Sequence, residues 1–334
     1  MISVSSLKIL FLEVDPEDRP LVLGRYPNAQ IIDAPLEGDA LLKAAKDAAI
    51  VSCFIQTSFS ADVLRKLPKL KLICTRSVGY DHIDLDAAKK QGITVCNVPD
   101  YGSYVIAEHV FALLLGTLRH IDEGDKRVEG GVFDYHGLRG VALCCKTIGI
   151  VGTGRIGRHV AKIAHGFGMK ILAVDQCRTL ELEKEYGVVY VDLDTLLAGS
   201  DILTLHLPAT KETQHLLDAP AFSKMKKGVI LVNTARGSLI DSKTLLKALN
   251  DGIVSHALLD VLEHEKSGSS TRGGDRALID HPRVVTTPHI AFYADSSMRN
   301  MYNDAFQSID EFIAGKTPQH AVRPVSIVCD VRRL

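Results

Sequence analysis

Three polar side chains suited to acid–base chemistry follow apolar runs that are typical of buried strands. Arg236 lies in VNTARG, Glu265 in LDVLEHE and His289 in TTPHIA. A histidine can donate and recover a proton near neutral pH, and a neighbouring carboxylate stabilises its charged form. The planar guanidinium of arginine can bind a carboxylate through two hydrogen bonds. These residue types predict an anion clamp, an orienting carboxylate and a general acid or base.

Each of the three residues also has a simpler explanation. His289 could be an ordinary surface or core histidine, Glu265 a solvated loop charge, and Arg236 a helix cap. We favour the functional interpretation because the carboxyl ends of parallel strands meet at one edge of a sheet. Open α/β sheets bind their ligands at that edge.

A glycine-rich turn follows another predicted strand. The segment KTIGIVGTGRIG at 146–157 runs from an apolar strand directly into three glycines. In a dinucleotide-binding motif such glycines permit the tight turn, the approach of the backbone to a pyrophosphate and close packing of the helix on the strand. The helix expected at 158–166 would present its N-terminal N–H groups to phosphates. The cofactor-binding residues predicted by this motif are Gly152, Gly154, Arg155, Ile156 and Gly157.

An acidic residue ends the strand that follows the glycine-rich helix. Asp175 lies 18 residues after Gly157, where a carboxylate can accept hydrogen bonds from both hydroxyls of an adenosine ribose. Its charge repels a 2′-phosphate, so we expect NAD rather than NADP, although Arg178 is close in the sequence. A surface-turn aspartate is the alternative interpretation.

Composition excludes several classes of protein. A chain of 334 residues suggests two domains, and 39 Lys plus Arg against 40 Asp plus Glu leave no basic excess for nucleic acid. The hydrophobic fraction of 46% and the charged fraction of 24% are typical of a globular chain. Because no run of 18 apolar residues and no signal-peptide pattern is present, we expect no membrane partner and a cytoplasmic location.

The cysteines and histidines show no spacing typical of a metal site. No Cys-x-x-Cys pair occurs among seven cysteines, and Cys53, Cys74 and Cys96 lie inside apolar runs. We expect small buried thiols rather than disulfides, and we expect no metal.

Short apolar runs alternate with helix-like segments along almost the whole chain, which predicts an α/β fold with parallel sheets. In the first hundred residues we expect strands at 8–14, 30–33, 49–54, 71–75 and 94–97, and helices at 39–48, 60–67 and 85–91. The second series of strands is expected at 147–151, 170–174, 188–191, 202–206, 229–233, 256–259 and 284–286. An amphipathic stretch at 103–119 precedes a polar, glycine-containing segment at 122–140, and a last helix is expected at 298–314.

Longer segments carry a resemblance to a known family. They are RSVGYDHIDLDAAKKQGI at 76–93, NVPDY at 97–101, IAEHVFALLL at 106–115, GTGRIG, TLHLPATKET at 204–213, NTARG, LDVLEHE and TPHIAFY. Over essentially its whole length the chain resembles the D-isomer-specific 2-hydroxyacid dehydrogenases, and within them most closely the D-lactate dehydrogenases. The resemblance implies hydride transfer between NADH and a small 2-oxo acid, with pyruvate and D-lactate as the expected pair.

The resemblance also implies roles for individual residues. Arg236 would bind the carboxylate and carbonyl oxygen of the substrate, His289 would protonate that oxygen, and Glu265 would keep His289 charged. Further substrate contacts are expected from the backbone N–H groups of Val78 and Gly79 and from the rings of Tyr101 and Phe292. Asp260 would face the nicotinamide carboxamide. The cofactor groove would also include Thr204, His206, Pro208, Thr234 and Ala235.

The family fold implies two doubly wound parallel-sheet domains, with a Rossmann NAD-binding domain inserted into a flavodoxin-like substrate domain. Residues 1–103 and 296–334 would form the substrate domain and 104–295 the NAD-binding domain, with the active site in the cleft. His109, Phe111 and Leu113–Leu115 lie on a helix whose apolar face we expect to form the seam of a homodimer. Core packing is the alternative for that face.

Two features depart from the family pattern, and two other functions are considered. Lys266 follows Glu265 where members often have proline, and it begins the segment SGSSTRGG at 267–274, which has the composition of a mobile loop. Gly102 and Ser103 lie in the substrate neighbourhood. A glyoxylate or hydroxypyruvate reductase would need polar partners where the two aromatic rings stand. A non-catalytic NAD(H)-sensing, corepressor-like protein is disfavoured by the intact set of Arg, Glu and His.

Overall fold

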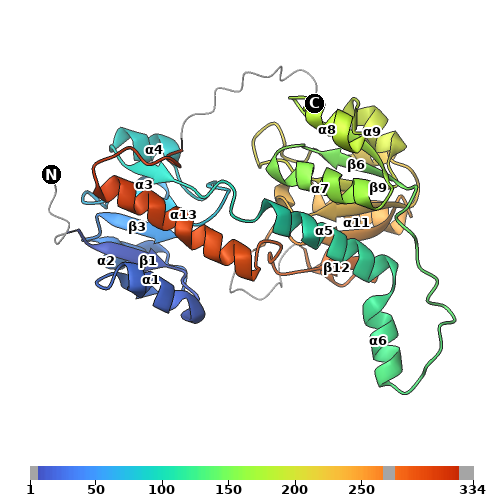
Figure 1. Ribbon diagram of the computed structural model, residues 1–334, viewed down its shortest axis with the longest axis horizontal. Helices are drawn as coiled ribbons and strands as arrows, with labels where there is room; N and C mark the ends of the chain where they lie inside the picture. Colours follow the sequence, from blue (N-terminus) through green and yellow to red (C-terminus); the bar gives the residue numbers. More distant parts are fainter. Residues whose placement is uncertain (1–6, 266–274, 323–334) are drawn as a thin grey trace. The chain divides into compact units, whose positions relative to one another are not determined.

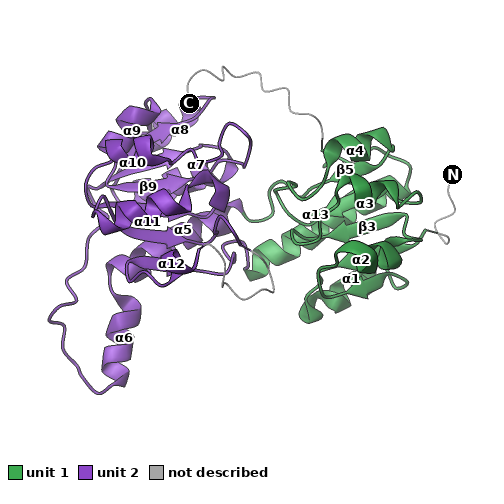
Figure 2. Cartoon of the chain, turned by 180° about the vertical axis from the view of Figure 1, so that it is seen from behind, with its two compact units in different colours: residues 1–102, 294–326 green, residues 103–293, 327–334 purple. Residues whose placement is uncertain are grey.

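A computed structural model describes residues 7–265 and 275–322 of this chain. They form two compact units (Figure 2): unit 1 comprises 7–102 and 294–322, and unit 2 comprises 103–265 and 275–293. The predicted boundaries lie at 103/104 and 295/296. Each unit is a parallel sheet with helices packed on it, so the predicted α/β class is confirmed (Figure 1). Lys266 and the loop expected at 267–274 lie outside the described residues.

The sheet of unit 1 has five parallel strands in a flavodoxin-like order. In spatial order they are β2 (Gln30–Ile32), β1 (Ile9–Leu12), β3 (Ile50–Cys53), β4 (Leu72–Thr75) and β5 (Thr94–Cys96). The helices are η2 (Pro16–Asp18), α1 (Arg19–Arg25), α2 (Gly38–Ala45), α3 (Ala61–Arg65), α4 (Leu85–Lys90) and α13 (Asp295–Ile313). The prediction missed α1 because its seven residues include a proline and a glycine, which obscure a helical pattern.

The sheet of unit 2 has seven parallel strands in the Rossmann order, extended by one strand at the edge. They are β12 (Val284–Thr286), β11 (Val254–Leu259), β10 (Val229–Asn233), β9 (Ile202–Leu205), β6 (Thr147–Val151), β7 (Lys170–Val174) and β8 (Val189–Tyr190). The helices are α5 (Ser103–Leu118), α6 (Ile121–Glu129), α7 (Arg155–Gly166), α8 (Leu180–Tyr186), α9 (Leu193–Gly199), α10 (Ala219–Lys224), η3 (Gly237–Leu239), α11 (Ser242–Asn250) and α12 (Arg276–Ile279). The bounds of β6, β7, β10 and β12 are those predicted.

The apolar helix α5 belongs to the core of unit 2. Phe111, Leu113 and Leu114 are buried there, and the ring of Phe111 stacks on that of Phe167 with centroids 5.3 Å apart. The core-packing alternative therefore holds for Phe111, Leu113 and Leu114, whereas His109 and Leu115 are half-buried and a dimer seam through them stays a prediction.

The polar, glycine-containing segment at 122–140, for which no helix was predicted, contains most of the helix α6. Its apolar residues are few, but ion pairs of the i, i+4 type join Lys126 to Asp122 (2.7 Å) and Arg127 to Glu123 (3.3 Å). Such pairs support an isolated helix without an apolar face. In Figures 1 and 2, α6 and the chain that follows it project from the body of unit 2.

The cysteines follow the prediction only in part. Cys53, Cys74 and Cys96 are buried free thiols, as expected. Burial raises the pKa of Cys53 and of Cys96 to about 12, which keeps both thiols protonated at neutral pH. Cys177, in contrast, is disulfide-bonded, which corrects the expectation of thiols.

No single helix in the described part of the chain is long and apolar enough to cross a membrane. Helices α5 and α6 together have the length and composition of a membrane-spanning segment, but the pair is bent by 53°. Most of α5 is buried in the core of unit 2.

A fully buried arginine ties together the core of unit 1. Arg76 follows β4, and its guanidinium donates to the hydroxyl of Ser52 (3.0 Å) and to the carbonyl oxygens of Leu12 (2.7 Å) and Glu13 (2.6 Å). The same group lies 5.2 Å from the ring centroid of Tyr302 on α13. Arg76 thus joins the ends of β1, β3 and β4 to the helix that returns from the far end of the chain.

We predict that Arg76→Met lowers the free energy of unfolding by about 1–3 kcal/mol, because buried oxygens lose their hydrogen-bond donors. The measurement is urea unfolding followed by circular dichroism. Arg65→Met is the matched control, since Arg65 is paired with Asp62 on the exposed face of α3 and should change stability by less than about 1 kcal/mol. Equal effects of the two substitutions would contradict the role assigned to Arg76.

Candidate active site in unit 2

Most of the residues predicted to do chemistry follow neighbouring strands of one sheet edge. Along the edge of unit 2, His289 follows β12, Asp260 and Glu265 follow β11, and Arg236 follows β10. Further along, His206 follows β9, the glycine turn follows β6 and Asp175 follows β7. The order of strands reverses between β9 and β6, which is where open α/β sheets bind ligands.

The glycine-rich turn has the close contacts that only glycine permits. Gly152 has a φ of +95°, and a Cβ there would lie 2.6 Å from the carbonyl oxygen of His206. A Cβ on Gly157 would lie 2.0 Å from the carbonyl oxygen of Gly152, whereas nothing lies within 4 Å of one on Gly154. Gly154 is the N-cap of α7, so the helix begins at Arg155, earlier than the predicted residue 158. Gly152 and Gly157 are therefore required by packing, and Gly154 leaves open space in front of the helix.

Asp175 stabilises the glycine turn. Its Oδ2 accepts hydrogen bonds from the backbone N (2.6 Å) and the hydroxyl (3.0 Å) of Thr153, and its Oδ1 accepts one from the N of Cys177 (2.9 Å). The hydroxyl of Thr153 also contacts that of Tyr190 (2.9 Å), and the guanidinium of Arg178 lies 6.0 Å from the Tyr190 ring centroid. The sequence did not indicate this second task of Asp175, and the contact with a ribose stays a prediction.

Two buried polar atoms at the strand-order reversal suit a bound cofactor. Nδ1 of His206 and Oγ1 of Thr234 are buried and have no partner among the described residues. Nε2 of His206 contacts the hydroxyl of Thr204 (2.9 Å), and burial lowers the pKa of His206 to about 3, so its ring is neutral. Unpaired buried polar atoms are costly unless a ligand satisfies them. The edge therefore fits a dinucleotide, flanked by the exposed Pro208 and the buried Ala235.

His289 and Glu265 are in direct contact. Nδ1 of His289 lies 3.0 Å from Oε1 of Glu265, and their side chains are 27% and 41% exposed. Oε2 of Glu265 accepts a hydrogen bond from the N of Leu262 (3.2 Å). With Nδ1 engaged, Nε2 is the ring nitrogen that can transfer a proton to another molecule. The predicted acid–base pair thus forms in unit 2.

Asp260 holds the turn that carries His289. His289 adopts a left-handed backbone (φ +56°), which is rare for residues other than glycine. Buried Asp260 accepts hydrogen bonds from the hydroxyl of Thr287 (2.5 Å) and from the N of Ile290 and of Ala291 (both 2.9 Å). Its carbonyl oxygen accepts from the N of His289 (2.9 Å). Sequence reasoning missed this task of Asp260, and its contact with a nicotinamide stays a prediction.

The turn that carries Arg236 packs directly on the turn that precedes Glu265. A Cβ on Gly237 would lie 2.1 Å from the carbonyl group of Leu262, so only glycine permits this approach. Asn233 fixes the turn: its side chain donates to the carbonyl oxygen of Arg236 (2.8 Å) and accepts from the N of Ala235 (3.0 Å). Nη1 of Arg236 donates to the carbonyl oxygen of Ala235 (2.8 Å). The sequence signal for Asn233 and Gly237 was the segment NTARG itself.

The predicted substrate residues outside the sheet edge are distributed over the two units. In unit 1, Val78 is exposed, Gly79 is half-buried and Tyr101 is buried. The side chain of Asn97 donates to the carbonyl oxygen of Val78 (2.8 Å), which fixes that turn. In unit 2, the ring of Phe292 meets that of His289 edge to face, with centroids 6.4 Å apart. The roles of these residues toward a substrate stay predictions.

Comparison with known proteins agrees with this arrangement. Residues 111–291 match the family described as D-isomer specific 2-hydroxyacid dehydrogenase, NAD binding domain. The chain belongs to the D-isomer-specific 2-hydroxyacid dehydrogenases. Unit 2 contains the NAD-binding domain of this dehydrogenase, and the predicted cofactor, NAD, is confirmed.

Relatives of this dehydrogenase carry different names. The chain is 36% identical over 319 residues to a glyoxylate reductase from Aeropyrum pernix, covering 93% of each chain. It is 37% identical over 324 residues to a D-lactate dehydrogenase from Lactiplantibacillus plantarum, covering 92% of this chain and 96% of the other. Among solved structures, the chain is similar to a D-lactate dehydrogenase from Aquifex aeolicus complexed with NAD and lactic acid, with a TM-score of 0.85 and 36% identity. The match covers 92% of this chain and 96% of the other.

We predict that two glycine substitutions separate the packing of this dehydrogenase from its binding of cofactor. Gly157→Ala should lower the free energy of unfolding by about 1–3 kcal/mol, because its Cβ meets backbone. Gly154→Ala should cost less, about 0.5–1 kcal/mol, because its Cβ meets no other atom and only the N-cap becomes less favourable. Both should weaken NADH binding in a fluorescence titration. Equal losses of stability would contradict the packing described above.

Proposed function

We propose that this dehydrogenase reduces a small 2-oxo acid to the D-2-hydroxy acid with NADH, and that the acid is pyruvate. The observation that carries the proposal is the contact between His289 and Glu265 at the edge of an NAD-binding sheet. A histidine oriented by a carboxylate is a general acid, and the reduction of a carbonyl group needs a proton on its oxygen.

Each of the candidate residues of unit 2 has a separate role in the proposed reaction. His289 donates a proton from Nε2 to the carbonyl oxygen, and Glu265 stabilises the imidazolium before the transfer. Arg236 binds the carboxylate and polarises the carbonyl group through its planar guanidinium. Bound NADH supplies the hydride that adds to C2 of the acid. The neutral ring of His206 and the hydroxyl of Thr234 provide hydrogen-bonding groups for the cofactor.

The edge-to-face contact between Phe292 and His289 supports pyruvate as the substrate. It places an apolar ring beside the proton donor, where a methyl group on C2 has a surface to contact. A D-lactate dehydrogenase among the relatives, covered along 96% of its length, supports the same choice. Glyoxylate is the second candidate because several relatives are named glyoxylate reductase. A corepressor-like role is disfavoured, since binding of NAD alone does not need an oriented acid.

A panel of oxo acids tests this proposal. We expect the highest kcat/KM for NADH oxidation with pyruvate, compared with glyoxylate, hydroxypyruvate, phenylpyruvate and 2-oxoisocaproate, and oxidation of D-lactate but not of L-lactate. His289→Ala should lower kcat by about 10²–10⁴-fold, the effect of losing a general acid. His165→Ala, at an exposed position near the end of α7, is the matched control. Near-wild-type turnover of the His289 variant would exclude its role, and preference for glyoxylate would exclude pyruvate.

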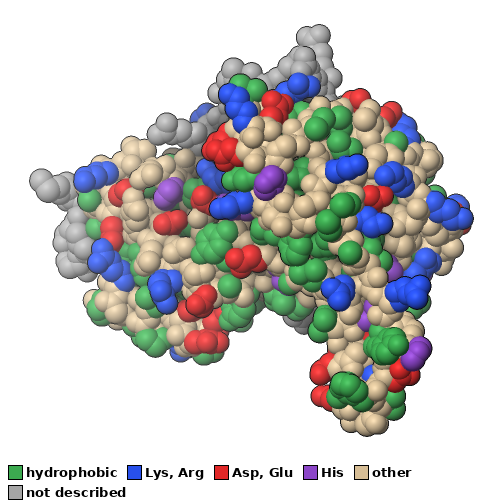
Figure 3. All heavy atoms as spheres, turned by 45° about the vertical axis from the view of Figure 1, so that its right-hand side comes forward, with side chains coloured by type: hydrophobic (Ala, Val, Ile, Leu, Met, Phe, Trp, Pro, Cys, Tyr) green, Lys and Arg blue, Asp and Glu red, His purple; other side chains and the backbone are tan. Residues whose placement is uncertain are grey.

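We also propose that two copies of the chain associate through the segment that projects from unit 2, comprising α6 and residues 130–142. Hydrophobic side chains lie on its surface (Figure 3), with Phe133 94% and Tyr135 79% exposed. Helix α6 has acidic residues in its first turn and basic residues in its last. Antiparallel pairing about a two-fold axis would therefore place opposite charges together. A second copy of the chain is the partner that would both cover the exposed rings and pair the charges of α6.

Sedimentation velocity tests this association. We expect the wild-type chain to sediment as a dimer and Phe133→Asp as a monomer, because a buried unpaired carboxylate opposes association. Leu180→Asp is the matched control, since Leu180 is 65% exposed at the start of α8, outside the projecting segment. A monomeric wild-type chain, or a dimeric Phe133 variant, would refute the proposal.

A further inference from the structure

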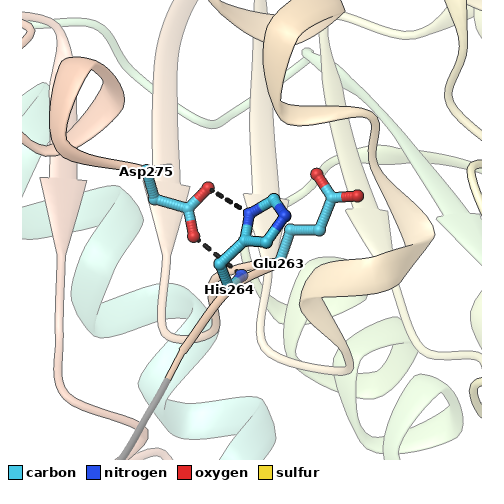
Figure 4. Close-up of side chains that lie close together, drawn as sticks. All are labelled: Glu263, His264 and Asp275. Atoms are coloured by element: carbon cyan, nitrogen blue, oxygen red, sulfur yellow. Dashed lines mark hydrogen bonds and ion pairs between the residues drawn. The ribbon is translucent and has the colours of Figure 1, made fainter. Parts of the chain in front are cut away.

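The residue directly before Glu265 is held by a buried carboxylate. Asp275, which is 4% exposed, accepts a hydrogen bond at Oδ2 from the backbone N of His264 (2.8 Å). Its Oδ1 lies 3.3 Å from Nδ1 of the same histidine (Figure 4). Both oxygens of Asp275 therefore contact one residue, and that residue is the neighbour of Glu265. The contact fixes both the backbone and the side chain of His264.

The residue before His264 is anchored in another direction. In Figure 4 the carboxylate of Glu263 points away from Asp275. Its Oε1 lies 2.5 Å from Nε2 of His215, and its Oε2 accepts from the N of Ser242 (3.1 Å). Burial acts to raise the pKa of Glu263, but the hydrogen bonds from His215 and Ser242 outweigh it and lower the pKa. Glu263 is thus an ionised anchor on the side opposite to Asp275.

We propose that Asp275 and Glu263 are positioning residues that hold the backbone of 263–265 so that the Glu265 carboxylate meets His289. This inference rests on the proposed function of that pair. The side chain of Glu265 is 41% exposed. Among the hydrogen bonds of the described residues, its carboxylate contacts only the N of Leu262 besides His289. A long exposed side chain loses rotamer entropy when it is held in one geometry. A fixed backbone reduces the number of geometries that compete with the productive one.

The same cluster has the composition of a cation site, but its contacts favour positioning. Ligand-type atoms of Glu263, His264 and Asp275 lie within 4.8 Å of one another. However, N–H donors already occupy both oxygens of Asp275 and one oxygen of Glu263, and His215 contacts the other. A cation would have to displace the hydrogen bonds that fix the turn. The oxygens therefore serve the polypeptide itself.

A double-mutant cycle between Asp275 and Glu265 tests the inference. Asp275→Ala should lower kcat for 2-oxo acid reduction by about 10–100-fold, as expected for misplacing a reacting group, and change KM less. Asp275→Asn should recover most of the loss because its amide oxygen can still accept from the N of His264. In a Glu265→Gln background, Asp275→Ala should cause little further loss, since the carboxylate that it positions is already absent. Asp280→Ala is the matched control, because Asp280 is an exposed partner of Arg276.

The pH profile supplies a second readout that a purely structural role would not move. Under the proposed function His289 supplies the proton, so the pH dependence of kcat reports on the surroundings of its imidazole, and Glu265→Gln changes those surroundings. Asp275→Ala should therefore change the pH profile in the same direction as Glu265→Gln does. Other titratable groups also lie near this turn, and all of them are present in the wild type and in each variant. They are His215, Asp241, His264, Asp260 and His109.

Each outcome of the cycle decides the inference. Equal losses from Asp275→Ala in both backgrounds, or an unshifted pH profile, would overturn positioning while leaving the proposed function intact. Wild-type activity of Glu265→Gln would overturn both. If Asp275→Ala does not fold, as judged by circular dichroism, Glu263→Gln takes its place in the same cycle. We again expect non-additive losses of kcat, and additive losses would overturn the inference.

Discussion

The candidate active site depends on one buried carboxylate more than on any other group. Asp260 accepts three hydrogen bonds from the chain between Thr287 and Ala291, and its own carbonyl oxygen accepts from His289. These bonds sustain a left-handed backbone at His289 that the residue would otherwise avoid. The orientation of the imidazole, and with it the contact to Glu265, follows from that backbone. The position of the proposed proton donor, His289, is therefore set by a residue at the end of the neighbouring strand β11.

Much of this arrangement could be predicted because its signals are local in the sequence. Strand β10 is an apolar run that ends at Asn233, and β6 is a mostly apolar run that ends directly before Gly152. Both the strands and the residues that follow them could therefore be predicted from the sequence. The glycines at 152 and 157 mark backbone contacts that admit no side chain. Parallel pairing then brings the ends of successive strands to one edge, which assembled His289 and Glu265 without further information.

The remainder depends on contacts between distant residues, which periodicity does not encode. Glu263 contacts His215, which is 48 residues away in the sequence, and Asp260 accepts a hydrogen bond from Ile290, which is 30 residues away. Helix α6 was missed for a different reason, because surface ion pairs stabilise it in place of an apolar face. The apolar face of α5 looked larger than one domain needs, yet Phe111, Leu113 and Leu114 are buried in the core of unit 2. Burial in the core of one chain and burial against a partner produce the same pattern of residues.

The site combines exposed reactive groups with buried supports, and the two halves need different surroundings. His289 and Glu265 are partly exposed, so under the proposed function the imidazole would regain a proton from water after each transfer. Exposure alone would leave both side chains mobile and their ion pair weak. Asp260 and Asp275 are buried, where hydrogen bonds to the backbone are strong and competition from water is small. Because buried carboxylates fix the backbone on which His289 and Glu265 stand, these two side chains can remain in contact with solvent and still keep one geometry.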